Sequence, residues 1–372
     1  MPVNCGIVGL PNVGKSTIFS ALSGADAEAA NYPFCTINPN VGIVNVPDAR
    51  LIKMSGIFKP LRTIPATVEF VDIAGLVKGA AKGEGLGNQF LAHIREVGII
   101  AHVVRCFDNA DIIHVANKID PRSDMEVINI ELALADLDTA CRRRERAERA
   151  LKSAAGKKEA ESVLAVLDKV QPALEDGKAV RALRLSEADA ALVADCHFIT
   201  AKPQLYVCNT DEAGIKQAAA GLAHPLVDAV REQARSEEAE YVVICGKFEA
   251  ELADISEEAE KAEFLAELGL KESGLARLIR GAYGLLNLCT FFTAGSDECR
   301  AWTVRSGASA PEAAGVIHSD FEKGFIKAEV YSFDDIVTYG SEAKIKEAGK
   351  YRLEGRDYIV HDGDVMFFKF NA

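Results

Sequence analysis

The sequence predicts an α/β fold that carries a long helical insertion and ends in a small α+β domain. Five short, continuously apolar runs suit parallel strands that are covered by helices on both faces. Residues 125–192 are rich in strong helix formers and contain proline only at position 172. After residue 285, short strand-like runs alternate with turns. These three observations divide the chain into a first domain of residues 1–284 and a second of residues 285–372.

The strands of the first domain are predicted from its apolar runs. They are residues 4–9, 68–73, 99–107, 204–208 and 241–245. The first run leads into a glycine-rich turn and then into a helix that begins at Lys15. A strand, a turn and a helix in this order are the start of a βαβ unit.

Two long antiparallel helices are predicted for an insertion at about residues 125–200. Apolar residues recur at helical spacing from Leu132 to Leu137 and again from Val163 to Val170. Gly156 lies between the two groups, so residues 153–158 suit the tip of a coiled-coil hairpin.

The predicted C-terminal domain has five short strands: residues 288–293, 301–304, 326–330, 358–359 and 365–370. The turn at His361, Asp362 and Gly363 precedes the last of them. This spacing favours a separate small α+β domain.

Composition excludes several classes of protein. The chain has 372 residues, a hydrophobic fraction of 49% and a net charge of −13, so it is globular and is not a general nucleic-acid binder. Its nine cysteines occur without a C-x-x-C pair, which favours reduced thiols in the cytoplasm. No apolar run approaches the roughly 18 residues of a membrane span, and the N-terminus lacks the basic start of a secretion signal.

A phosphate-binding loop is predicted at residues 9–16, which read GLPNVGKS and match G-x-x-x-x-G-K-S/T between a strand and a helix. Glycines let successive backbone N–H groups turn toward one anion, and the positive end of the helix dipole faces it. Lys15 would reach the β- and γ-phosphates, and the hydroxyl of Ser16 would bind Mg²⁺. The residues predicted to hold the nucleotide phosphates are Asn12, Val13, Gly14, Lys15, Ser16 and Thr17.

A D-x-x-G motif follows the predicted strand at residues 68–73. Asp72 would support Mg²⁺, and the N–H of Gly75 would sense the γ-phosphate. Thr36 lies between the two motifs and is predicted to be the second hydroxyl ligand of Mg²⁺. The simpler interpretation of Thr36 is an ordinary surface threonine.

These motifs resemble those of a known family. The segments NYPFCTINPN and DIAGLVKGAAKGEGLGNQFL, together with the phosphate loop, are similar to the Obg family of P-loop GTPases, and the whole chain resembles its Obg-like ATPase branch. The tail segments HSDFEKGFIKAEV and DYIVHDGDV resemble a TGS domain, which is a ubiquitin-like β-grasp module. The resemblance implies a Ras-like nucleotide-binding domain over residues 1–284 and a TGS domain over residues 285–372. It also implies Mg²⁺-dependent ATP hydrolysis and binding to the large ribosomal subunit or the whole ribosome.

Two segments compete for recognition of the base. Residues 117–120 spell N-K-I-D, the guanine motif, but they follow the strand at 99–107 too closely for a parallel crossover. Residues 209–212 read N-T-D-E and directly follow a strand. This segment therefore reads N-x-x-E in place of N-K-x-D. Guanine offers two donors that a short aspartate accepts, whereas adenine offers an acceptor that a carboxylate would repel. Asn209 and Glu212 in this pattern favour ATP over GTP. The segment at 245–247 stands where relatives carry a loop that contacts the base, and its role stays open.

Hydrolysis needs a group that orients water. Leu76 follows Gly75 where Ras-like enzymes carry glutamine, and leucine cannot hydrogen-bond water. The resemblance implies that His114 takes this role, whereas a packed or solvated histidine is the alternative. The predicted catalytic residues are therefore Lys15, Gly75 and His114.

A basic cluster lies near the predicted hairpin tip. Residues 142–158 hold eight Arg or Lys residues against two glutamates, a local charge of +6. Such a cluster suits the phosphates of ribosomal RNA, and the alternative is a solvated coiled-coil face. Two other functions stay open for the whole chain: a GTPase of ribosome assembly, or an RNA-binding module in which turnover is secondary.

Overall fold

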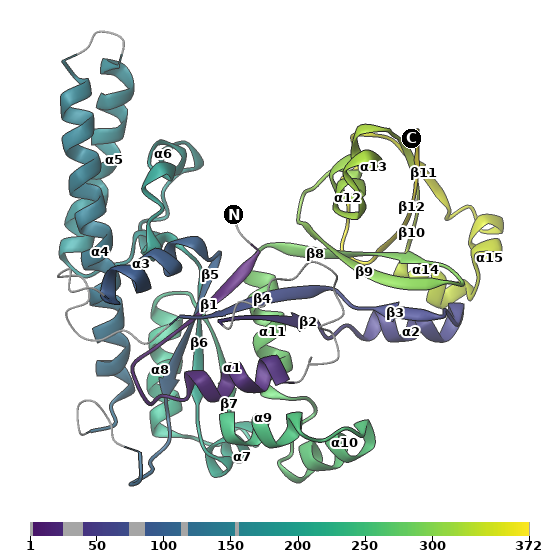
Figure 1. Ribbon diagram of the computed structural model, residues 1–372, viewed down its shortest axis with the longest axis horizontal. Helices are drawn as coiled ribbons and strands as arrows, with labels where there is room; N and C mark the ends of the chain where they lie inside the picture. Colours follow the sequence, from purple (N-terminus) through teal and green to yellow (C-terminus); the bar gives the residue numbers. More distant parts are fainter. Residues whose placement is uncertain (1–2, 25–39, 74–85, 113–117, 153–155, 372) are drawn as a thin grey trace. The chain divides into compact units, whose positions relative to one another are not determined.

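A computed structural model describes residues 3–24, 40–73, 86–112, 118–152 and 156–371. The chain forms two compact units (Figure 1). The first contains residues 1–42 and 69–282, and the second contains residues 43–68 and 283–372. In the described part of the chain, no helix is both long and apolar enough to span a bilayer.

A six-stranded sheet forms the centre of the first unit. Its strand order is β2-β4-β1-β5-β6-β7, and the four strand pairs from β4 to β7 are all parallel. The strands are β1 (Asn4–Val8), β2 (Val41–Asn45), β4 (Thr67–Asp72), β5 (Ile99–Arg105), β6 (Gln204–Asn209) and β7 (Glu240–Ile244). The five predicted strands are confirmed as elements, whereas β2 was missed because Gly42 and Asn45 leave it without a continuous apolar run.

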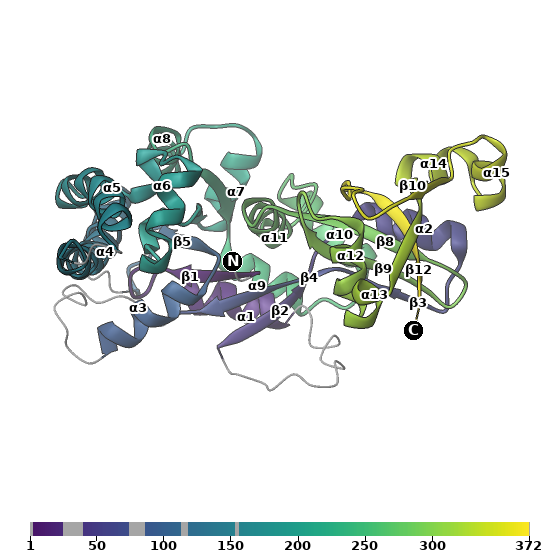
Figure 2. The same ribbon diagram turned by 90° about the horizontal axis from the view of Figure 1, so that it is seen from above.

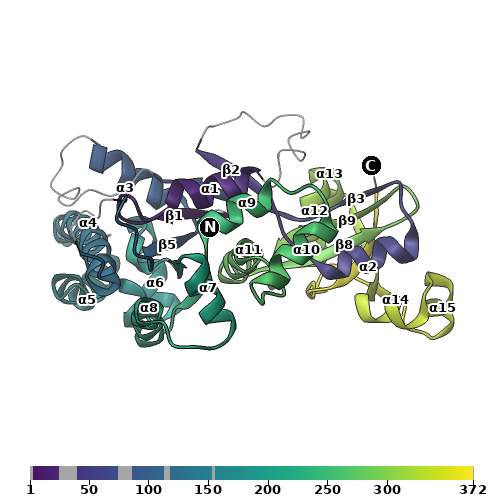
Figure 3. The same cartoon turned by 90° about the horizontal axis from the view of Figure 1, so that it is seen from below.

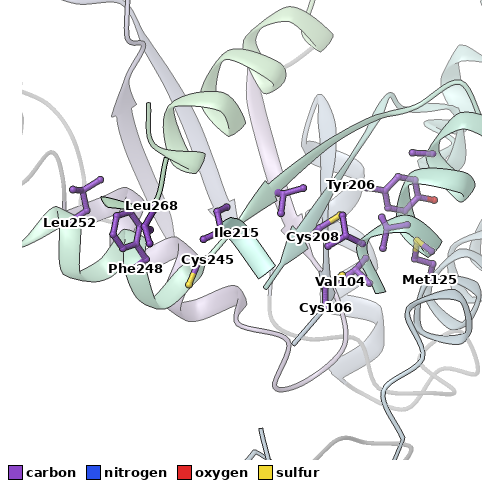
Figure 4. Close-up of a cluster of buried hydrophobic side chains, with 14 residues drawn as sticks. Val104, Cys106, Met125, Tyr206, Cys208, Ile215, Cys245, Phe248, Leu252 and Leu268 are labelled. Carbon is purple, nitrogen blue, oxygen red and sulfur yellow. The ribbon is translucent and has the colours of Figure 1, made fainter. Parts of the chain in front are cut away.

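Helices cover this sheet, as continuous burial of β5 and β6 requires. They are α1 (Lys15–Gly24), α3 (Leu86–Glu96), α7 (Glu212–Ala219), α8 (Pro225–Ser236), α9 (Gly246–Ala253) and α11 (Gly274–Leu285). A further helix, α10 (Glu258–Glu267), packs on α9 through the stacked rings of Phe264 and Phe248. Figure 4 shows one part of the core, where Val104, Cys106 and Tyr206 of the sheet region gather with Ile215 of α7 and Phe248 of α9. This packing holds the carboxyl ends of the neighbouring strands β5, β6 and β7 close together on one side of the sheet.

The predicted helical hairpin is present. It consists of α4 (Pro121–Ala150) and α5 (Lys157–Glu175), which run side by side (Figures 2 and 3). Ala133, Ala140 and Ala147 recur every seventh residue and are buried in the seam, so the two backbones approach closely. The short helices η3 (Val180–Leu183), α6 (Glu187–Leu192), η4 (Ala194–Cys196) and η5 (Ile199–Ala201) lead back to β6.

The second unit is built on another six-stranded sheet, with the order β11-β10-β12-β8-β9-β3. Its elements are α2 (Ala49–Phe58), β3 (Arg62–Ile64), β8 (Leu288–Ala294), β9 (Glu298–Arg305), α12 (Ala310–Ile317), α13 (Ser319–Lys323), β10 (Phe325–Ser332), α14 (Phe333–Tyr339), α15 (Glu342–Glu347), β11 (Arg352–Glu354) and β12 (Asp364–Phe370). The first and last strands of the tail, β8 and β12, are parallel neighbours in the middle of the sheet. This order, with α12 between the second and third strands, is that of a β-grasp fold.

The structure differs from the sequence-based boundaries in one segment. Residues 43–68, expected in the first domain, belong to the second unit. There β3 pairs with β9, with Arg62 opposite Glu298, and Arg50 of α2 forms an ion pair of 2.6 Å with Asp362. Because these partners lie far apart in the sequence, neither segment carries a local pattern from which the pairing could be predicted. Likewise, the strand expected at 358–359 is only an isolated bridge between Ser309 and Ile359.

Candidate functional site

The phosphate loop connects the carboxyl end of β1 to the start of α1. Gly9 and Gly14 have φ angles of +154° and +97°, which side-chain-bearing residues rarely adopt. A Cβ at Gly9 would lie 2.5 Å from the carbonyl oxygen of Val103, and a Cβ at Gly14 would lie 2.1 Å from Nδ2 of Asn209. Both glycines are therefore required by the backbone angle and by the space available.

Helix α1 offers its free N–H groups at this loop. The N–H of Ile18 makes the first intrahelical bond, to the carbonyl of Gly14 at 3.0 Å, so the N–H groups of Lys15, Ser16 and Thr17 have no partner within the helix. The hydroxyl-bearing residues Ser16 and Thr17 are exposed. An anion placed here would meet several N–H donors and the positive end of the helix dipole.

Lys15 and Asp72 form the charged part of the site. Lys15 is only 8% exposed, and its Nζ donates to the carbonyl oxygen of Leu10 at 2.7 Å. Burial lowers the pKa of Lys15, and the charge of Asp72 partly opposes this shift. Burial likewise raises the pKa of Asp72, opposed by Lys15. Each charge is thus incompletely compensated, and a bound phosphate would stabilise the lysine.

Asp72 has the features of a metal-supporting carboxylate. Its Oδ1 is buried and has no hydrogen-bond partner among the described residues, while its N–H donates to the carbonyl of Asn40 at 2.9 Å. A buried, unpartnered carboxylate oxygen is costly unless a cation or donor meets it. With the hydroxyl of Ser16 it provides hard oxygen donors, which fit Mg²⁺.

Asn209, predicted to lie at the base, holds three segments together. Its Nδ2 donates to the carbonyl of Val13 at 2.8 Å, and its Oδ1 accepts from the N–H of Gly246 at 2.9 Å. The phosphate loop, the end of β6 and the start of α9 therefore meet at one side chain that is 5% exposed. The sequence carries no local signal for these two contacts.

The other residues of the N-T-D-E segment point to different tasks. The hydroxyl of Thr210 donates to the carbonyl of Cys106 at 3.3 Å and is buried. Asp211 caps α7 by accepting from the N–H of Gly214 at 2.8 Å. Glu212 is exposed and lies 3.5 Å from Nζ of Lys247, so the segment at 245–247 is brought to the same end of the sheet.

The rival N-K-I-D segment lies at the start of the hairpin. The described part, from Lys118 onward, shows Asp120 as the N-cap of α4 and Lys118 paired with Asp120 at 3.3 Å. Asp120 thus has a helix-capping role in the fold.

Several predicted site residues lie outside the described residues. They are Thr36, Gly75 and His114, together with Leu76. Their assigned roles stay predictions.

The basic side chains of the hairpin fall into two groups. Arg143 pairs with Asp195 at 3.0 Å and Arg144 with Asp168 at 2.6 Å, and both are partly buried. Arg142 pairs with Asp138, and Lys157 pairs with Glu161 at 3.9 Å, each pair within one helix. The other group is exposed and, in the described residues, forms no ion pair with an acidic side chain; it consists of Arg146, Arg149, Lys152 and Lys158.

Two family models match parts of the chain. Residues 4–135 match a family model described as a 50S ribosome-binding GTPase. Residues 288–371 match the model YchF-GTPase_C, described as a protein of unknown function.

Full-length relatives are also found. The chain is 56% identical to the ribosome-binding ATPase YchF of Escherichia coli O157:H7 and 51% identical to that of Bacillus subtilis, in each case over 100% of both chains. A solved structure of the YchF GTPase of Schizosaccharomyces pombe superposes with a TM-score of 0.88 at 35% identity, covering 99% of this chain and 97% of the other. Since identity above half extends over the entire length, this chain belongs to the YchF family.

Proposed function

We propose that this chain is a Mg²⁺-dependent ATPase that uses hydrolysis of ATP to ADP and phosphate as a switch on the ribosome. The observation that carries the proposal is the phosphate loop, whose glycines, Lys15 and free helix N–H groups are those that phosphate binding requires, in a chain whose full-length relatives are named ribosome-binding ATPases.

Phosphate binding follows from the chain's own groups. The N–H groups of Lys15, Ser16 and Thr17 would hold the phosphates, and Lys15 would exchange its bond to the carbonyl of Leu10 for the β- and γ-phosphates. Binding would restore the stabilisation that burial removes from the lysine charge.

Mg²⁺ would be held by Ser16 and Thr36, with Asp72 in support. The unpartnered Oδ1 of Asp72 supports this set. When bound, the ion supplies neutralisation of the phosphate charge that develops in phosphoryl transfer. Gly75 would sense the γ-phosphate through its N–H, and His114 would orient the attacking water in place of the missing glutamine.

The base end favours adenine. Thr210, which stands where a guanine-binding site carries lysine, turns its hydroxyl into the sheet toward Cys106, so no lysine stem covers the base there. Glu212 forms an ion pair with Lys247. It also replaces the shorter aspartate that accepts hydrogen bonds from guanine in a guanine-binding site. Asn209 would keep the phosphate loop and the base end in fixed relation.

The ribosome would be met by the hairpin. Arg146, Arg149, Lys152 and Lys158 are exposed and would contact rRNA phosphates of the large subunit. Screening limits charge interactions to about 8 Å at physiological salt, so the net charge of −13 on the chain hardly opposes this local contact. Ribosome binding would place the protein in the cytoplasm.

A nucleotide competition titration tests the enzymatic part. ATP should displace a bound fluorescent analogue at lower concentration than GTP at matched Mg²⁺, by roughly 10–100-fold, because a lost or repelled charged hydrogen bond is worth about 1.5–3 kcal/mol. Equal or tighter binding of GTP would favour a GTPase of ribosome assembly instead. A hydrolysis-deficient variant that still performs the cellular role would favour an RNA-binding module.

A further inference from the structure

Arg105, the last residue of β5, is the largest fully buried side chain of the described structure, at 1% exposure. Within the described residues, its guanidinium group donates to backbone carbonyls. Nε donates to Phe107 at 3.2 Å, Nη1 to Ile112 at 3.1 Å and Nη2 to Asn109 at 3.2 Å.

This arrangement is costly for a cation. Buried arginines are normally paired with carboxylates, yet no ion pair of Arg105 with an acid is found in the described part of the chain. The charge is met by three carbonyl dipoles and by the ring of Phe107, whose centroid lies 4.6 Å from Cζ. An aliphatic residue would fill the end of a buried strand without this desolvation, so packing alone does not account for an arginine here.

The three carbonyls belong to one turn, residues 107–112. The turn is closed further by the N–H of Ile112 donating to the carbonyl of Asn109 at 3.2 Å and by the N–H of Asp111 donating to Oδ1 of Asn109 at 2.9 Å. The planar guanidinium has donors in a fixed fork, and it can bind three points of the turn at once. Arg105 therefore sets the shape of the turn.

The turn begins beside the candidate base-recognition residues. Arg105 is the register partner of Asn209 across β5 and β6. The N–H of Cys106 donates to the carbonyl of Asn209 at 2.7 Å, and the hydroxyl of Thr210 donates to the carbonyl of Cys106 at 3.3 Å. Ligands of open parallel sheets bind outside the carboxyl ends of the strands, which is where the turn lies.

We propose that Arg105 is a positioning residue for the nucleotide base, acting by holding the turn at 107–112 as one wall of the base end. This rests on the proposed nucleotide-binding function. On this proposal, the buried charge of Arg105 supports binding of the base and has no direct role in binding the phosphates.

The test compares two ligands that differ in the presence of the nucleoside. Dissociation constants of ATP and of inorganic tripolyphosphate, both with Mg²⁺, are measured by calorimetry for the wild type, Arg105→Lys and Arg105→Gln. Lysine keeps the charge but donates from a single nitrogen, so it lacks the fork of donors by which three guanidinium nitrogens bind three separate carbonyls. We expect ATP to bind about tenfold or more weakly in both variants, the scale of one charge-assisted hydrogen bond, with tripolyphosphate unchanged.

Two further variants separate positioning from general destabilisation. Asn109→Ala removes the side-chain oxygen that accepts from the N–H of Asp111 on the exposed turn. This variant should weaken binding of ATP but not of tripolyphosphate, by a smaller factor than the Arg105 variants. Arg181→Lys is the control, because Arg181 is a partly buried arginine that binds Gln204 at 2.6 Å and Glu237 at 2.8 Å, at the amino end of β6. It should lower the melting temperature and leave the ratio of the two constants unchanged.

If the Arg105 variants bind ATP and tripolyphosphate more weakly by the same factor, the proposal is overturned, since Arg105 would then act on the phosphates. An unchanged ratio in both Arg105 variants would also overturn it. If those variants do not fold, Asn109→Ala decides, and a wild-type ratio there is a refutation. Failure of the wild type to bind ATP would instead refute the proposed function.

Discussion

Replacing Arg146, Arg149 and Lys152 with glutamine should weaken ribosome binding through the loss of charge alone. All three side chains are exposed on or next to the far half of α4. Arg146 and Arg149 donate to backbone carbonyls one turn away, so among the described residues glutamine removes no hydrogen bond that joins α4 to α5. The hairpin should therefore stay folded.

The expected size follows from counterion release. Each phosphate neutralised by a basic side chain adds about 0.7–0.9 to the slope of log K against log salt. Three lost contacts should reduce the steepness of that slope by about 2–3. Arg143 and Arg144 are unsuitable targets, because their ion pairs with Asp195 and Asp168 link parts of the insertion and their loss would confound folding with binding.

The assay is sedimentation with purified large subunits over a salt series from about 50 to 200 mM, the range over which such contacts change affinity strongly. The control is a triple variant of equal charge change outside the hairpin, Lys216→Gln with Arg235→Gln and Lys271→Gln, all exposed. ATP hydrolysis without ribosomes should be unchanged in both. A hairpin variant with the wild-type slope would refute the reasoning and leave the hairpin as a solvated face.

Three further predictions concern the first unit. Gly14→Ala places a Cβ 2.1 Å from Nδ2 of Asn209 at a φ of +97°, and strain of about 1–3 kcal/mol should weaken ATP binding tenfold or more; a wild-type titration would contradict this. Asn209→Ala leaves the carbonyl of Val13 and the N–H of Gly246 unpaired, which should lower the free energy of unfolding by about 1–3 kcal/mol for each group, measured by urea denaturation. Burial lowers the pKa of His102 to about 3, so the unfolded chain binds more protons below pH 6.5, and stability is lost as the pH falls through that value. Between pH 7 and 5 the wild type should lose about 2 kcal/mol more than His102→Gln, measured by urea denaturation at each pH, and an equal loss in the two proteins would contradict this.

Much of the fold follows from local patterns. The strand, glycine turn and helix around Lys15 are predictable because each depends on neighbouring residues: a buried run, positive φ at Gly14 and a helix start. The hairpin is predictable because its residues favour helix over long stretches. The Mg²⁺ role of Thr36 was predicted from its place between the two nucleotide motifs and the water role of His114 from the family resemblance, and both residues lie outside the described part of the chain.

Tertiary structure alone decided which distant groups meet. Asn209 lies 196 residues from Val13, yet its amide fixes the phosphate loop. The same holds for Arg143, whose partner Asp195 is 52 residues away, and for α2, whose Arg50 meets Asp362 across 312 residues. The physical reason is that helix and strand propensity and the spacing of apolar residues depend on residues close together in the chain. Hydrogen bonds and ion pairs between distant residues depend on how whole helices and strands pack, and no local pattern records this packing.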